Sequence, residues 1–169
     1  MIRLRKIEPS DLPFLYQWEN DASVWADGNN HNPLSQQDLR DYIASTTGDI
    51  YRDGQLRLMV EELSEVSCQP SETLGCIDLF DFYARNGRAA LGMYIAPEAR
   101  GKGVGKQALE VLEQYAFGHL HLRVLYAVIA TNNIACSGLY EKAGYKAFGP
   151  LPNWTLESDT RIWIKTNEA

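Results

Sequence analysis

A glycine-rich, cationic segment follows a strand-like apolar run in this chain and precedes a helical pattern. Backbone N–H groups at the start of a helix have no partner within it, and the helix dipole adds positive charge there, so such a site binds phosphate. Glycine also lets the backbone approach a ligand closely. We therefore predict a pyrophosphate-binding turn. Its residues are Arg100, Gly101, Lys102, Gly103, Val104, Gly105 and Lys106.

Two common phosphate-binding loops do not fit this segment. A P-loop needs Ser or Thr directly after its lysine to hold magnesium, and Gln107 stands there instead. The dinucleotide fingerprint Gly-x-Gly-x-x-Gly requires a different glycine spacing. The remaining alternative is a glycine-rich loop that only turns the chain.

A second segment, residues 131–145, follows an apolar run typical of a buried strand. Asn132 or Asn133 can cap a helix here, and Gly144 is a typical helix end. The helix carries the run Leu-Tyr-Glu-Lys-Ala-Gly-Tyr, in which the first tyrosine is Tyr140. Spacing alone favours Tyr140 as an aromatic packing residue.

Arg-x-x-Gly-x-Gly at 100–105, followed by an Asn and Leu-Tyr-Glu-Lys-x-Gly-Tyr at 133–145, resembles two motifs of the GNAT family of N-acetyltransferases. The resemblance implies an α+β fold with a mixed, mostly antiparallel sheet flanked by helices. Two central parallel strands, here 88–96 and 123–130, would be splayed apart. The resemblance also implies one N-acetyltransferase domain over residues 1–169 and acetyl-CoA as co-substrate, with no metal.

The same resemblance assigns roles to individual residues. The diphosphate of acetyl-CoA would lie on the glycine-rich turn, with further donor contacts at Tyr94, Ile95 and Asn133. Tyr140 would contact the donor and act as the general acid that protonates the departing thiolate. A neutral amine would attack the thioester directly in a ternary complex.

The general base is not evident. Relatives often carry Glu in the strand before the turn, where this chain has Ala90. Asp78 and Asp81 lie three apart in the preceding strand, so a regular strand points them to opposite faces. Asp78 would share the face of Phe80 and Phe82, and is the candidate base. Deprotonation relayed through water is the alternative.

Gly92 interrupts the strand before the turn. A bulge there would leave backbone N–H groups free to hold the thioester carbonyl. The alternative is a glycine that makes room for a neighbouring side chain.

Acceptor candidates come from the first two helices, their connecting loop and a late loop. Trp25, Asp27 and Phe80 are the residues assigned to the acceptor, because aromatic rings and carboxylates together suit an ammonium group. Trp18 is expected in the core.

Periodicity and turn residues predict the remaining elements. Ser35 is a predicted helix cap, with Asp38 completing a capping box. The other predicted ranges are strands at 2–5, 55–63, 73–82, 145–148 and 160–165 and helices at 10–20 and 35–46.

Bulk properties narrow the class of protein. The chain has 169 residues, of which 45% are apolar and 22% charged, as in globular domains. Its net charge of −6 argues against nucleic acid as a partner and is compatible with a cationic substrate. It has no apolar run of membrane length and no signal-peptide pattern, and its three cysteines lack metal spacing, so we expect a cytoplasmic protein without a membrane partner.

We therefore expect an enzyme that acetylates a primary amine: a polyamine, a protein N-terminus or an amino sugar. The N-terminal segment resembles the branch with ribosomal-protein N-terminal and polyamine acetyltransferases. A non-catalytic acyl-CoA-binding sensor module is the alternative. The final strand and late loop could also pair with a second copy, giving a homodimer.

Overall fold

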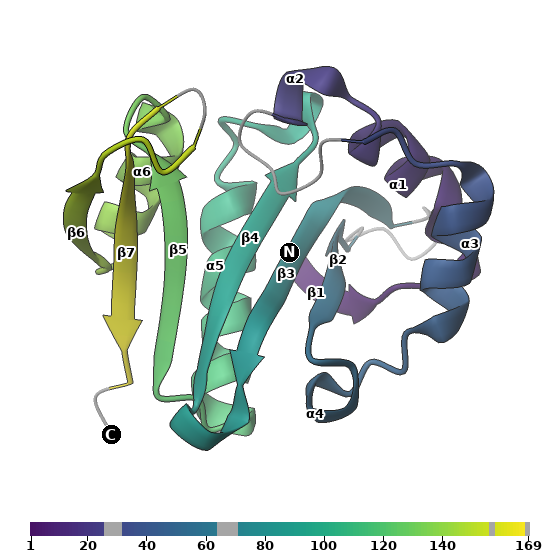
Figure 1. Ribbon diagram of the computed structural model, residues 1–169. Helices are drawn as coiled ribbons and strands as arrows, with labels where there is room; N and C mark the ends of the chain where they lie inside the picture. The colour runs from purple at the N-terminus through teal and green to yellow at the C-terminus, as the bar shows by residue number, and fades with distance from the viewer. Residues whose placement is uncertain (26–31, 64–70, 156–157, 168–169) are drawn as a thin grey trace.

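Seven strands form one sheet in the computed structural model, which describes residues 1–25, 32–63, 71–155 and 158–167 (Figure 1). The strand order is β1-β2-β3-β4-β5-β7-β6, and β4–β5 is a parallel pair while the other neighbours are antiparallel. The predicted mixed, mostly antiparallel sheet is thus confirmed. The strands are β1 (Ile2–Lys6), β2 (Leu56–Glu62), β3 (Glu72–Tyr83), β4 (Arg88–Ile95), β5 (Val124–Ala130), β6 (Lys146–Leu151) and β7 (Thr160–Thr166).

Helices cover both faces of this sheet. The predicted helices are present, and two four-residue helices, α2 (Ala22–Trp25) and α4 (Ile50–Asp53), were not predicted. Ser35 caps α3 and forms the predicted capping box with Asp38. No helix within the described ranges is long and apolar enough to cross a membrane. The helices are α1 (Leu12–Glu19), α2 (Ala22–Trp25), α3 (Gln36–Ser45), α4 (Ile50–Asp53), α5 (Val104–Glu113) and α6 (Ile134–Lys142), with a π-helical continuation of α5 at Gln114–His119.

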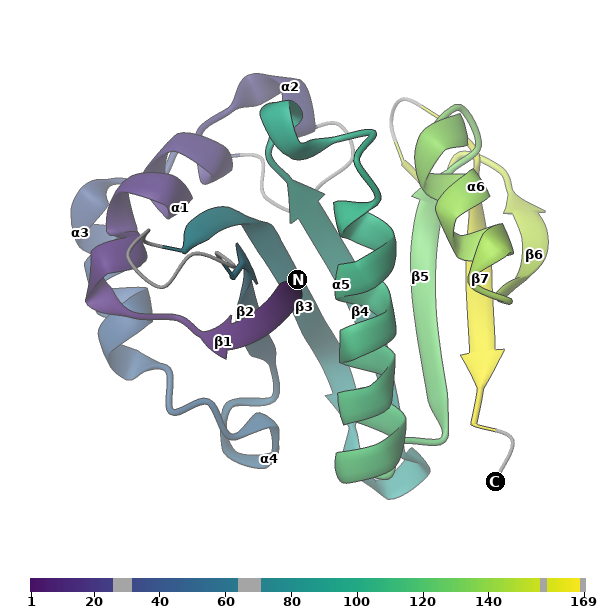
Figure 2. The same cartoon turned by 180° about the vertical axis from the view of Figure 1, so that it is seen from behind.

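Two hydrophobic cores lie on opposite faces of the sheet, because successive strand residues point to opposite sides. Helices α5 and α6 cover one face, as Figure 2 shows from behind, and the core there includes Ile77 and Leu109. Helices α1 and α3 cover β2 and β3 on the other face, over a core that includes Leu15, Met59 and the expected Trp18. In Figure 1 no helix lies in front of β5, β7 and β6.

The central parallel strands separate after a short paired stretch. Strand β4 pairs with β5 at three positions only, and the last pair is Ala90 with Tyr126. Beyond it the strands diverge (Figure 1), while β4 stays paired with β3 as far as Ile95. The predicted splay is therefore confirmed. Among the residues that the structure describes, none forms a partner strand for residues 91–95 of β4 on the β5 side.

The end of β3 departs from the predicted alternation. Its pairing with β4 shifts between Phe80 and Tyr83, and Asp81 there has a φ of 45°. The extra residue places Phe82 against the core under α5. The prediction that Phe82 shares the face of Asp78 is therefore wrong, because a bulge inverts the alternation of every residue after it.

Gly92 makes room for a side chain. Its pairing with Asp78 belongs to an unshifted stretch of the β3–β4 ladder, so no bulge occurs between these strands at Gly92. A Cβ atom at Gly92 would lie 3.4 Å from the Phe80 ring. The backbone groups free on β4 result from its separation from β5.

Candidate active site

The glycine-rich turn leads directly into α5. Gly101 and Gly103 have φ values of 74° and 80°, a conformation that glycine adopts without steric cost. Gly103 is the N-cap residue, and no side chain within the described ranges caps this helix. The N–H groups of Val104, Gly105 and Lys106 therefore have no acceptor within α5. The start of α5 is a ready site for an anion.

Gly105 serves packing within the first turn of α5. A Cβ atom at this position would lie 3.4 Å from Met93 Sδ and 3.6 Å from Leu139 Cδ2. These two residues come from β4 and α6. The absence of a side chain thus lets the start of α5 lie close to both β4 and α6.

Three residues that are predicted to contact acetyl-CoA meet at the end of β4. Arg100 Nε donates a hydrogen bond of 2.8 Å to the Ile95 carbonyl oxygen, and its guanidinium lies 5.6 Å from the Tyr94 ring centroid. Tyr94 also packs against Trp18, with ring centroids 5.2 Å apart. Partial burial raises the pKa of the Tyr94 hydroxyl, an effect that the positive charge of Arg100 opposes. Lys102 and Lys106 are exposed.

Tyr140 is buried in the core beneath α6, with 2% of its surface exposed. Its ring meets Tyr145 edge-on, with centroids 4.9 Å apart. Burial raises the pKa of the Tyr140 hydroxyl well above its usual value, so the phenol is protonated at neutral pH. Packing and proton donation are compatible roles for this residue, and the catalytic role stays a prediction.

Asn133, not Asn132, caps α6. Its Oδ1 accepts a hydrogen bond of 3.1 Å from the backbone N–H of Cys136. The cap places the start of α6 directly after β5, on the opposite side of the separated strands from β4 (Figure 2). The predicted contact of Asn133 with acetyl-CoA would therefore come from the start of α6.

A partly buried ion pair holds the other end of α6, and no sequence motif predicts it. Lys165 Nζ lies 2.7 Å from Glu113 Oε2 and donates a hydrogen bond of 2.8 Å to the carbonyl oxygen of Ala143. The same ammonium group lies 5.6 Å from the Tyr145 ring centroid. Lys165 thus ties β7 and α5 to the helix that carries Tyr140. Glu113 and Lys165 are 52 residues apart, so no local sequence motif predicts their contact.

Asp78 is held by an arginine that sequence reasoning missed. Arg57 donates two hydrogen bonds of 2.8 Å, one to each carboxylate oxygen of Asp78, and a third of 2.5 Å to Glu19. Arg57 lies opposite Asp78 in the β2–β3 register. Since Arg57 engages both oxygens of Asp78, this arrangement disfavours the carboxylate as a proton acceptor. Its role as base stays a prediction.

Loss of Arg57 should destabilise the fold. In an Arg57→Met variant, two carboxylates of about 20% exposure would lose their shared cation. We expect the free energy of unfolding to fall by about 3 kcal/mol and the melting temperature by about 5–10 °C. Thermal and urea unfolding would measure this. The exposed Arg40→Met is the control, and an equal effect in both variants would contradict the prediction.

The other acceptor candidates lie around this ion cluster. Trp25 Nε1 donates a hydrogen bond of 2.9 Å to the Glu19 carbonyl oxygen and so joins α2 to α1. Phe80 lies over Gly92 on the face of Asp78. Asp27 lies outside the described residues.

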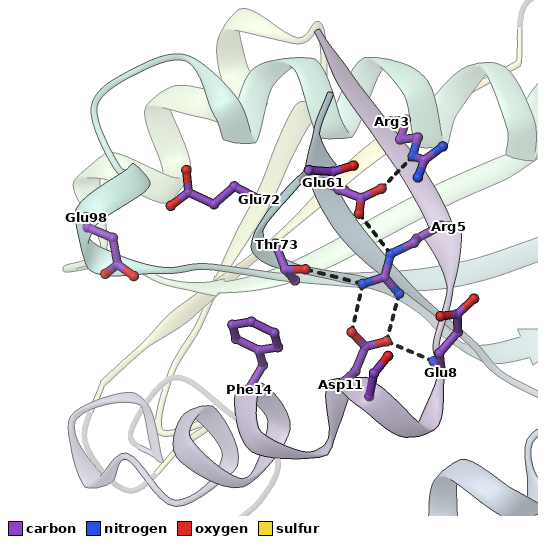
Figure 3. Close-up of a pocket in the computed structure, with 11 residues that line it drawn as sticks. Arg3, Arg5, Glu8, Asp11, Phe14, Glu61, Glu72, Thr73 and Glu98 are labelled. Atoms are coloured by element: carbon purple, nitrogen blue, oxygen red, sulfur yellow. Dashed lines mark hydrogen bonds and ion pairs between the residues drawn. The ribbon is translucent and has the colours of Figure 1, made fainter. Parts of the chain in front are cut away.

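A cavity of about 880 Å³ lies elsewhere, between β1, β3 and the start of α1 (Figure 3). Buried Asp11 accepts two hydrogen bonds of 2.7 Å from Arg5, whose Nε lies 3.4 Å from Glu61. Phe14 and Glu98 complete part of its wall. None of the residues predicted for the active site lines this cavity.

Comparison with known proteins supplies the family. An acetyltransferase (GNAT) domain model matches residues 2–146. The chain is 28% identical over 153 residues to spermidine N(1)-acetyltransferase of Escherichia coli strain K12, covering 89% of this chain and 75% of that protein. It is 24% identical over 150 residues to spermidine N(1)-acetyltransferase of Vibrio cholerae, covering 89% and 82%.

Solved structures share the fold. The crystal structure of Vibrio cholerae spermidine N-acetyltransferase in complex with CoA and spermine matches with a TM-score of 0.84 at 22% identity, over 98% of this chain and 95% of that one. A dodecameric structure of that enzyme matches with a TM-score of 0.81 at 22% identity, over 98% and 93%. Because the family model spans most of the chain and the separated strands lie beside the uncapped start of α5, this protein belongs to the acetyltransferase (GNAT) domain family.

Proposed function

We propose that this acetyltransferase transfers an acetyl group from acetyl-CoA to a primary amine of a polyamine, by direct attack in a ternary complex. One observation carries the proposal: the free edge of β4 lies beside the uncapped N-terminus of α5. We also propose that residues 1–169 are one domain, since a single sheet joins strands from β1 to β7. The cytoplasmic location stays a prediction.

The donor would bind along these two features. The diphosphate would accept hydrogen bonds from the amides of the turn and the start of α5, near Arg100. The pantetheine arm would lie along the unpaired edge of β4, beside Tyr94 and Ile95, where its amides can replace the missing strand partner. Asn133 would contact the donor from the other side of the separated strands.

Tyr140 would complete the chemistry. As the amine attacks, negative charge develops first on the thioester oxygen and then on the sulfur. Free N–H groups of β4 are suited to the oxygen. The Tyr140 phenol would donate its hydrogen to the sulfur, and because burial raises its pKa, it enters the reaction protonated.

A polyamine is the acceptor that the residues and relatives favour over a protein N-terminus or an amino sugar. Glu19 and Asp78 are two carboxylates sharing one cation, Arg57, and aromatic Trp18 and Tyr94 lie on the same side of the sheet. Excess negative charge with aromatic surfaces suits an extended polycation. The curated relatives are spermidine N(1)-acetyltransferases.

An amine panel tests this proposal. The protein would be mixed with acetyl-CoA and, separately, with spermidine, spermine, putrescine, an N-terminal peptide and glucosamine, while release of the CoA thiol is followed. We expect release with the polyamines and a product of one added acetyl group by mass spectrometry. CoA binding without release for any amine would instead support the sensor module.

We also propose that the chain associates with further copies through the face of β5, β7 and β6 that no helix of the described ranges covers. Val128, Ile162 and Phe148 lie in one cross-strand row there, and Val128 and Phe148 are 42% and 53% exposed. A second copy is the expected occupant because the similar Vibrio cholerae enzyme forms a dodecamer.

A charge in this row should weaken the assembly. We expect Phe148→Glu to lower the molar mass found by light scattering, with association at least roughly 10-fold weaker, since a carboxylate would lose its water at the interface. Tyr51→Glu, at another exposed aromatic residue, is the control. A wild-type protein that is monomeric at every concentration would contradict the proposal.

A further inference from the structure

Asp81 and Tyr126 meet across β4. Asp81 lies in the bulge that ends β3, and its carboxylate accepts a hydrogen bond from the hydroxyl of Tyr126 on β5. Asp81 has a φ of 45°, which few non-glycine residues adopt, although Asp and Asn adopt it more readily than others. Bulges of this kind often redirect a side chain beside an active site.

The pair lies where the separated strands fork. Phe80, Ala90 and Tyr126 form one row across β3, β4 and β5, and the Ala90–Tyr126 pair is the last before the strands diverge. The next row toward the open end contains Asp78 and Gly92. Tyr126 alternates with buried Leu125 and Ala127, so it faces away from α5, toward the side of Phe80.

The residues named beside the fork offer no other free proton acceptor. They are Phe80, Ala90, Asp78 and Gly92. Ala90 has no polar side chain, and Arg57 binds both oxygens of Asp78. Asp81 is exposed, so water reaches its carboxylate. Its hydrogen bond to Tyr126 connects that water to the fork.

We propose that Tyr126 and Asp81 form a proton relay that removes the proton from the acceptor ammonium group. This inference rests on the proposed function. The ammonium N–H bond breaks as its hydrogen bonds to the Tyr126 oxygen, directly or through one water, and the amine keeps the electron pair. The original Tyr126 O–H bond breaks as its hydrogen moves to an Asp81 carboxylate oxygen, which then releases a proton to bulk water.

The charges around Tyr126 suit a relay. Burial, with Asp81 next, raises the pKa of Tyr126 to about 12, whereas the positive charge of Arg88 lowers it. Arg88 itself lies 5.4 Å from the Tyr83 ring centroid. The phenol therefore stays protonated at neutral pH and passes protons without ionising. The exposed Asp81 carboxylate then passes this proton to the water around it.

Two conservative variants test the relay. Asp81→Asn keeps a residue that tolerates positive φ, and Tyr126→Phe keeps the ring. With acetyl-CoA and spermidine, we expect each to lower kcat/KM roughly 100-fold at pH 7. Near pH 10 the free amine is already neutral, so each variant should recover to within about threefold of wild type. The double variant should lose no more than either single one, because both belong to one path.

Two variants at exposed positions are the controls for the relay. Asp41→Asn and Tyr51→Phe, both at exposed positions, should leave the pH profile unchanged. A loss that is equal at every pH, a multiplicative loss in the double variant, or no loss would each overturn the relay while wild-type turnover upholds the acetyltransferase function. A wild-type protein that binds CoA but acetylates no amine would overturn the proposed function itself.

Discussion

Replacing Tyr140 with phenylalanine is expected to lower kcat for acetyl transfer roughly 100- to 1000-fold, while KM for acetyl-CoA changes less than about threefold. The hydroxyl would act only as the thiolate leaves, so its loss removes an interaction made in the transition state. The ring stays in its buried position against Tyr145. Steady-state release of the CoA thiol, with spermidine varied and saturating, measures both constants.

Tyr145→Phe is the matched control for this prediction. It removes a second buried hydroxyl, which lies near the Glu113 carboxylate, and keeps the edge-on contact between the rings. We expect its kcat to stay within about threefold of wild type. If Tyr140→Phe and Tyr145→Phe behaved alike, Tyr140 would be a packing residue only. Unfolding curves of both variants would show that the fold is retained.

Replacing Gly103 with aspartate is expected to weaken acetyl-CoA binding about 100-fold, which equals about 2.7 kcal/mol. Gly103 is the N-cap residue of α5, and an Asp carboxylate there would accept hydrogen bonds from the N–H groups proposed for the diphosphate. It would also repel the diphosphate. Isothermal titration with CoA measures the affinity directly.

The fold should survive this change. Aspartate is a favoured N-cap residue, and the positive φ of Gly103 costs it about 1–2 kcal/mol. Gly103→Asn has the same shape and the same tolerance of this conformation without the charge, so we expect only about a 10-fold loss of affinity. Equal losses in Asn and Asp would exclude repulsion as the cause. Unchanged affinity in both would place the diphosphate away from this turn.

The Arg57 ion cluster and the β3 bulge were beyond prediction from the sequence. Arg57 is 21 residues from Asp78 and 38 from Glu19, so only the pairing of β2 with β3 and the packing of α1 bring them together. Asp78, rather than Asp81, was predicted as the general base because a regular strand was assumed. One extra residue in the bulge reversed the side that Asp81 faces, and no local pattern signals that insertion.

What the sequence determined by itself was local: the glycine-rich turn before α5, the Ser35 cap, and the alternation that defines most strands. Short-range physics suffices for these, because glycine conformations, caps and side-chain periodicity depend on neighbouring residues. The tertiary structure alone decided which polar and charged side chains meet. Lys165 with Glu113 and Tyr126 with Asp81 are contacts across 52 and 45 residues, and they depend on strand register and on the fork between β4 and β5.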